Sequence, residues 1–276
     1  MGGPTAPVSD PALRLPRRGS TLAATQAAFR AWCLGYSGSD GGDMGGPRHP
    51  SIWVCGIEPG AARIVDAQAL AAQIRSADVS RPAPGYAHWR CNLAHSFTRR
   101  IAKLLAALAG GHVAEYRQFA EQEQPFTQGA HGFCRLNLYP LAFADTRPGR
   151  WNEALAQTTG FARKADYLAW CDAHRLPQLR AWARACRPRL VMALGKTYGA
   201  RFHAAFMDPA ALFVHEPIAG RQLSWGRNDD GTVVAVLPFL TSASGLQSDA
   251  AIQAFGARLR TIIAQSGPAR GPDRMA

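Results

Sequence analysis

The 276-residue sequence has few lysines, no closely paired cysteines and no long apolar run. Because no eighteen consecutive residues are apolar, no membrane-spanning helix is predicted. Residues 1–20 are rich in glycine and proline and lack the apolar stretch of a secretory signal peptide, so we expect a cytoplasmic protein. The six cysteines form no C-x-x-C pair, which argues against a zinc ribbon, a redox dithiol or a compact disulfide scaffold. We expect reduced thiols in a chain long enough to bury a core without metal or disulfides.

Acidic residues are also scarce, because 31 Lys+Arg face 19 Asp+Glu and give a net charge of +12. Only three of these basic residues are lysines, so arginine supplies most of the positive charge. Arginine binds phosphates and bases well, although such an excess also arises from genome base composition. The tails, residues 1–20 and 267–276, carry +2 and +1 and are expected to be disordered. The remaining +9 lies on residues 21–266, the predicted single domain, and favours a polyanion such as DNA as partner.

Four short apolar segments have the pattern of buried strands: residues 51–57, 132–139, 190–194 and 233–237. Amphipathic helices are predicted around them, over residues 21–34, 64–74, 93–108, 163–186 and 195–206 and in a closing segment that contains Ile252 and Ile263. This alternation predicts an α/β protein, a three-layer α/β/α fold with a central, mostly parallel four-stranded sheet. Residues 221–225 are a candidate edge strand.

The predicted helix over residues 163–186 is strongly basic, and Pro177 is expected to break or kink it. Only Asp166 and Asp172 oppose five basic residues: Arg163, Lys164, Arg175, Arg180 and Arg184. We expect this face to be either solvated surface or a contact with phosphates. In the second case part of the helix should flank the ligand site.

Ligands of parallel α/β sheets bind at the carboxyl ends of the strands, so the loops after the four strands are the candidate site. One of them, Gly195-Lys196-Thr197, resembles the end of a P-loop, but Leu190 stands where that motif requires glycine. The dinucleotide motif G-x-G-x-x-G and the hydrolase motif G-x-S-x-G are absent. Histidines and cysteines lack the spacing of metal or iron–sulfur sites, so we expect no metal and no cofactor.

Taken in order, the four loops resemble those of the uracil-DNA glycosylase superfamily. The first strand ends in G-I-E-P-G, the second ends with an asparagine, the third reads L-V-M-A-L-G-K-T, and S-G-L-Q precedes the last helix. The nearest loops are G-I-N-P-G and N-P-S-G-L-N of the mismatch-specific branch. This resemblance would cover about residues 50–266. It implies a monomeric base-excision repair enzyme that hydrolyses the N-glycosidic bond of a flipped uracil or other damaged base in DNA.

The resemblance implies a role for each loop. Glu58 matches the aspartate or asparagine that positions the attacking water, and its carboxylate suits an oxocarbenium-like sugar, although glutamate is one methylene longer. The alternative is that Glu58 braces the turn. Asn137 would read the Watson–Crick edge of the base, or else bond its own backbone at the strand end. The aromatic platform for the base is expected from Tyr86, His88 or Trp89, and Tyr86 is our candidate.

The last loop departs from the family pattern, because Ser242-Ala243-Ser244 replaces H-P-S or N-P-S. Ser242, a weaker donor, would assist the departing base. Ser244 and Gly245 match the part that contacts phosphate. Leu246 matches the apolar wedge that fills the gap left by the flipped base, or else makes a hydrophobic contact at the start of the closing helix. Four further residues are candidate contacts to the DNA backbone: Gln247, Gly56, Pro59 and Gly60.

Two other functions stay open. The replacement at Ser242 is consistent with a catalytically weak or inactive glycosylase fold that binds nucleic acid or a nucleotide. The second alternative is an unrelated α/β enzyme that acts on a small molecule and whose many arginines reflect only genome base composition.

Overall fold

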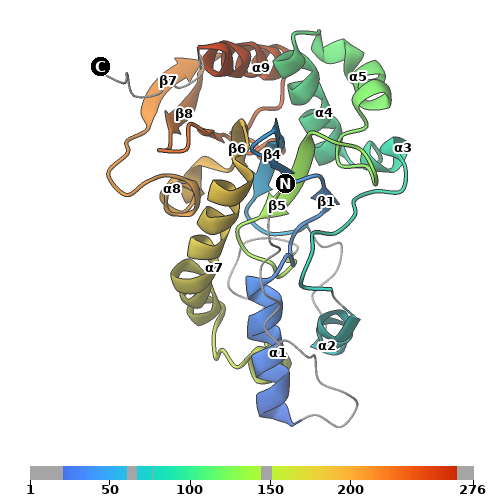
Figure 1. The fold of residues 1–276 in the computed structure, drawn as a ribbon, viewed down its shortest axis with the longest axis vertical. Helices are drawn as coiled ribbons and strands as arrows, with labels where there is room; N and C mark the ends of the chain where they lie inside the picture. Colours follow the sequence, from blue (N-terminus) through green and yellow to red (C-terminus); the bar gives the residue numbers. More distant parts are fainter. Residues whose placement is uncertain (1–20, 61–66, 77, 144–150, 266–276) are drawn as a thin grey trace, which may run out of the picture.

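The computed structural model describes residues 21–60, 67–76, 78–143 and 151–265, and both predicted tails lie outside them (Figure 1). Its main sheet consists of β1 (Gly41–Gly42), β4 (Ile52–Gly56), β5 (Phe133–Asn137), β6 (Leu190–Leu194), β7 (Val214–Ile218), β8 (Arg221–Arg227) and β9 (Val233–Leu237). A separate two-stranded ribbon pairs β2 (Gly45–Gly46) with β3 (His49–Pro50). The helices that surround the sheet are α1 (Leu22–Leu34), α2 (Ala67–Ser76), α3 (Trp89–Asn92), α4 (Ser96–Ala109), α5 (Tyr116–Glu123), α6 (Glu153–Thr159), α7 (Lys164–Cys186), α8 (Gly199–Phe206) and α9 (Asp249–Ala264), with 3-10 turns η1 (Val113–Glu115) and η3 (Lys196–Tyr198).

The strand order is β1-β5-β4-β6-β9-β8-β7. The four predicted strands are its parallel centre, β5-β4-β6-β9. β1 pairs antiparallel with β5, β8 with β9, and β7 with β8. The α/β class is therefore confirmed, but the predicted count of four strands is wrong, because the sheet has seven. Residues 221–225 belong to β8, and β7 rather than β8 forms the edge.

Helices cover both faces of the sheet. In β4, Trp53 and Cys55 enter the core layer shared with α1, α7 and α8, whereas Ile52 and Val54 enter the layer shared with α4 and α9. Figure 1 shows α4 and α9 on one side of the sheet and α1 and α7 on the other. Burial on both faces explains why these strands are continuous apolar runs without polar alternation.

Helix α7 continues through Pro177, so the predicted break is wrong, whereas the alternative of a kink stays a prediction. Proline removes one backbone hydrogen bond and crowds the preceding turn, at a cost of about 3 kcal/mol. Buried residues on both sides of it, among them Cys171, Leu176 and Leu179, pack into the same core layer. This packing holds the helix together across the proline.

All six cysteines are free, as expected, and four of them are buried: Cys33, Cys55, Cys134 and Cys171. Burial raises the pKa of the Cys55 and Cys134 thiols. Within the part of the chain that the structure describes, no helix is both long enough and apolar enough to cross a membrane.

Candidate functional site

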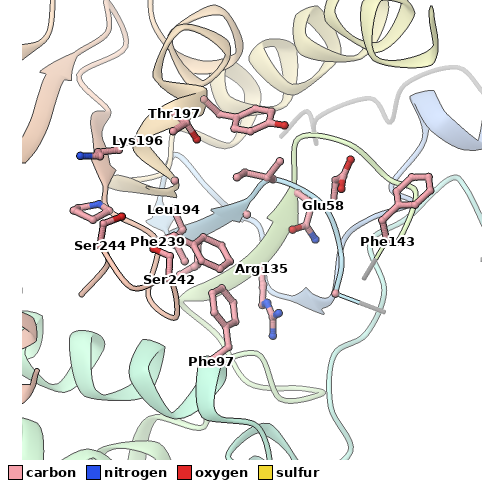
Figure 2. Close-up of a pocket in the computed structure, with 18 residues that line it drawn as sticks. Glu58, Phe97, Arg135, Phe143, Leu194, Lys196, Thr197, Phe239, Ser242 and Ser244 are labelled. Atoms are coloured by element: carbon pink, nitrogen blue, oxygen red, sulfur yellow. The ribbon is translucent and has the colours of Figure 1, made fainter. Parts of the chain in front are cut away.

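The loops that follow β4, β5, β6 and β9 converge on one cavity of about 480 Å³ at the carboxyl ends of these strands (Figure 2). Six of the predicted site residues line it: Gly56, Glu58, Gly60, Asn137, Ser242 and Ser244. Figure 2 shows Glu58 on one side of the cavity and Ser242 and Ser244 on the opposite side. Five predicted residues lie outside the lining: Pro59, Tyr86, Gly245, Leu246 and Gln247.

Glu58 is held by a lysine that the sequence pattern did not assign to the site. Lys164 Nζ lies 2.9 Å from Oε1 and 3.2 Å from Oε2 of Glu58. The two side chains are 2% and 5% exposed, respectively. The ammonium also lies 3.9 Å from the ring centroid of Phe143, which lines the cavity next to Glu58. Glu58 is thus part of a buried ion pair at the cavity wall.

Tyr198 lies close to this pair, and the ring centroid of Tyr139 lies 6.2 Å from that of Tyr198. Burial, and then the negative charge of Glu58, raise the pKa of the Tyr198 hydroxyl. Tyr139 donates to Asp172 over 2.6 Å, and Asp172 also accepts from Arg201 over 3.1 Å. Burial and the bond to Asp172 raise the pKa of Tyr139. Both phenols are therefore neutral hydroxyls at physiological pH.

Asn137 ends β5 and is 4% exposed. Its side-chain nitrogen donates to the carbonyl of Gly38 over 2.8 Å. The predicted alternative was a bond to the residue's own backbone, whereas Gly38 lies 99 positions away in the chain, so this bond joins Asn137 to another segment. A primary amide has a second hydrogen and an oxygen acceptor, so a bond to Gly38 leaves it the capacity to recognise a ligand.

The basic residues of α7 only partly form the expected surface, because Arg163 and Arg184 are exposed whereas Lys164 and Arg175 are not. Lys164 and Arg175 are buried, and each has charged or hydrogen-bonding partners inside the protein. Arg175 donates to the carbonyls of Cys33, Gly35, Ser37, Asn137 and Leu138. The other three are also engaged: Arg163 pairs with Asp166, Arg184 pairs with Asp208, and Arg180 donates to the carbonyl of Ala204. Five carbonyl acceptors compensate the guanidinium of Arg175 for its lost hydration.

Phe97 and Phe239 form a stacked aromatic pair at the cavity wall, whereas the predicted Tyr86 lies outside the lining. Their ring centroids are 5.3 Å apart with an interplanar angle of 28°. The guanidinium of Arg135 lies 5.3 Å from the Phe97 centroid and pairs with Asp40 at 2.8 Å. Figure 2 shows both rings and Arg135 at the cavity.

Tyr86 contacts this wall indirectly, because its hydroxyl accepts a hydrogen bond from Arg135 over 3.2 Å. His88 and Trp89 pack on each other at the start of α3, outside the cavity lining. Phe97 was recognisable from sequence only as part of an amphipathic helix. Its place in the first turn of α4 is what brings it to the cavity.

The loop after β9 is tightly folded. A Cβ on Gly245 would lie 1.8 Å from the carbonyl oxygen of Phe239, so only glycine fits there. The backbone N–H of Leu246 donates to the same carbonyl over 3.1 Å, and its side chain is fully buried with Leu240 and Ile252. A buried side chain is not placed to insert into DNA. The structure therefore corrects the wedge prediction in favour of the contact at the start of α9. Gln247 bonds back to the carbonyl of Ser242 over 2.6 Å.

The open side of the cavity carries hydroxyls and an ammonium. Lys196, Thr197, Ser242 and Ser244 line it and are exposed. Lys196 and Thr197 belong to the P-loop-like segment, which therefore reaches the site although its motif is incomplete. Such donors suit an anion or an oxygen-rich ligand.

Among the residues described, no group of three or more His, Cys, Asp and Glu side chains could hold a metal ion. No protein-family model matches the chain, and no curated protein is significantly similar to it in sequence. The functional assignment therefore depends on the loops and on the cavity that they form.

Proposed function

We propose that this protein is a DNA glycosylase that hydrolyses the N-glycosidic bond of a flipped uracil or other damaged base, as the resemblance of its loops implies. The observation that supports this most strongly is that Glu58, Asn137 and Ser242 lie at or after the carboxyl ends of three different strands and line one cavity. They are three residues to which the resemblance assigns chemistry, and they lie far apart in sequence.

The base would stack against Phe97 and Phe239, with its polar edge toward Asn137. The amide oxygen and the second amide hydrogen of Asn137 complement the alternating donor and acceptor of a uracil edge. Lys196, Thr197 and Ser244, on the open side, would contact the phosphates. Phosphate contacts position a strand without reading its sequence.

In the proposed reaction a water oxygen bonds to the sugar carbon C1′ while the bond from C1′ to the base nitrogen breaks. The electron pair of that bond leaves with the base. The Glu58 carboxylate holds the water, accepts the proton that the water loses on attack, and stabilises the positive charge that develops on the sugar. The departing base, which carries the electron pair, takes up a proton from solvent. Ser242 donates a hydrogen bond to the base as negative charge accumulates on it.

The test is formation of abasic sites on single- and double-stranded oligonucleotides that carry uracil, xanthine, hypoxanthine or a T·G mismatch. We expect base release from at least one of them, and a loss of about a hundredfold or more in Glu58→Gln. Glu121→Gln, at an exposed position on α5, is the matched control and should retain the wild-type rate. Tight DNA binding without release of any of these bases would refute the proposal that the protein is an enzyme.

A second function is favoured by the engagement of Glu58 with Lys164 and by the weak donor at Ser242. In this case the protein binds nucleic acid or a nucleotide and releases no base. Binding would weaken steeply with salt and would be unchanged by Glu58→Gln. DNA binding no tighter than that of a neutral control protein would instead favour a small-molecule enzyme.

A further inference from the structure

We propose that Lys164 is a positioning residue of this site, which keeps the Glu58 carboxylate ionised and fixes it at the cavity wall. This inference rests on the proposed function for its catalytic meaning. Lys164 lies behind Glu58 and is not part of the cavity lining, so it acts through Glu58 and not on the substrate.

The two residues are brought together by the fold. Glu58 follows β4, and Lys164 is the first residue of α7, 106 positions later in the chain. The ammonium contacts both carboxylate oxygens, at 2.9 and 3.2 Å, and its other side faces the ring of Phe143. Contacts on two sides leave the ammonium little freedom, so it defines where the carboxylate lies.

Burial explains why a cation is needed there. A carboxylate removed from water favours its protonated form, and an adjacent positive charge reverses this preference. A protonated Glu58 could not stabilise a positively charged sugar. The bond to Lys164 also fixes the end of a side chain that is one methylene longer than the family's aspartate or asparagine. The ion pair thus keeps Glu58 charged and also holds the end of its longer side chain in place.

Other ionisable groups lie around the same cavity. The charge of Glu58 acts on Tyr198 of η3, and Arg135 of β5 and Lys196 of η3 also line the cavity. Arg201 of α8 is bound to Asp172 of α7, and Arg135 is bound to Asp40. These two guanidiniums therefore have carboxylate partners of their own, whereas Lys164 lies at ion-pair distance from Glu58.

The first experiment measures base release against pH for Lys164→Met, Lys164→Arg and Arg163→Met. In Lys164→Met the acid limb of the profile should move up by about one pH unit or more, because Glu58 then takes up a proton more easily. In Lys164→Arg the acid limb of the pH profile should stay at its wild-type position. Arg163 is the matched control, since it is the preceding residue and its side chain is 77% exposed. An unmoved acid limb in folded Lys164→Met would overturn the inference.

A second experiment needs no catalytic activity. Carbon-13 NMR of the full chain with labelled glutamate follows the Glu58 carboxyl carbon, which the Glu58→Gln variant assigns. Glu58 should take up its proton at higher pH in Lys164→Met than in wild type. If the wild type releases no base, the proposed function fails. The titration of Glu58 still tests the role of Lys164 in that case. An unchanged Glu58 titration contradicts the role of Lys164.

If Lys164→Met does not fold, the double variant Glu58→Gln/Lys164→Met replaces both charges. Removing one partner of a buried pair leaves an uncompensated charge, whereas removing both does not. The double variant should therefore fold where the single variant fails. Absence of this rescue would show that Lys164 does not act through Glu58.

Discussion

A methyl group on Gly56 would lie 2.3 Å from the side-chain oxygen of Asn137. The two residues are paired neighbours at the ends of the parallel strands β4 and β5. Gly56 therefore provides the space that the Asn137 amide occupies beside the cavity. Because Gly56 has no side chain, the amide of Asn137 can take the orientation that it has beside the cavity.

Gly56→Ala should displace the Asn137 amide and weaken binding of an oligonucleotide that carries the target base. The overpacking should also destabilise the fold by about 1–3 kcal/mol. Fluorescence anisotropy measures the first effect and urea denaturation the second. Gly46→Ala, in β2 and outside the cavity lining, is the control, because nothing lies within 4 Å of its added methyl group. Equal behaviour of the two variants would contradict the packing argument.

Arg175→Met should destabilise the protein by about 3 kcal/mol or more, because it leaves buried carbonyls without a donor. The variant should also loosen the strand end at Asn137, whose carbonyl Arg175 binds. Urea denaturation provides the measurement. Arg184→Met is the control from the same helix, where the side chain is 55% exposed and the pair with Asp208 contributes about 1 kcal/mol or less. A small loss of stability in Arg175→Met would show that water replaces the hydrogen bonds of Arg175.

Phe97→Leu should weaken binding of a uracil-containing oligonucleotide by about tenfold, because stacking of a base on an aromatic side chain contributes roughly 1–3 kcal/mol. Trp89→Leu should leave this binding unchanged, since Trp89 lies outside the cavity lining. Dissociation constants measured at one salt concentration test both variants. A larger loss for Trp89→Leu would favour the sequence-based candidates over Phe97.

Asp43 should make a pH-dependent contribution to stability. Burial acts to raise the pKa of its carboxyl, but backbone N–H groups of Gly132 and Gly45, together with His131, outweigh burial and lower it. A group with a lowered folded-state pKa stabilises the fold above its ordinary pKa, and this contribution is lost as pH falls through the folded value.

Wild type should accordingly be more stable than Asp43→Asn at pH 7, and the difference should shrink progressively below about pH 4. Thermal unfolding across pH 2–7 measures it. Asp229→Asn, at an exposed position, is the control. A difference that is constant with pH would exclude the carboxylate as its source.

The sequence predicted the centre of the sheet well and its edges poorly. β6 and β9 have the predicted bounds, because each is an apolar run of five residues buried on both faces. β7 is mostly exposed, and β1 consists of two glycines, so neither carries a hydrophobic signal. Strands of this kind are defined by pairing with a neighbour, which the local sequence does not encode.

The candidate site was predictable to a similar degree. Parallel topology places the loops after the strands at one edge, and this brought Glu58, Asn137 and Ser242 to one cavity. Lys164 was assigned to a surface because helical charge is usually solvated. Its partner lies on another element, so only the tertiary structure reveals the pair.

Helix α7 imposes a length constraint on the site. Its first residue, Lys164, binds Glu58 after β4, and Arg175 binds the backbone of Asn137 at the end of β5. The two residues are eleven positions apart, which corresponds to roughly 16 Å of helix, and one inserted residue would rotate the following side chains by about 100°. Such an insertion would detach one of the two loops. This stretch of α7 should therefore tolerate substitutions on its outer side but neither insertions nor deletions.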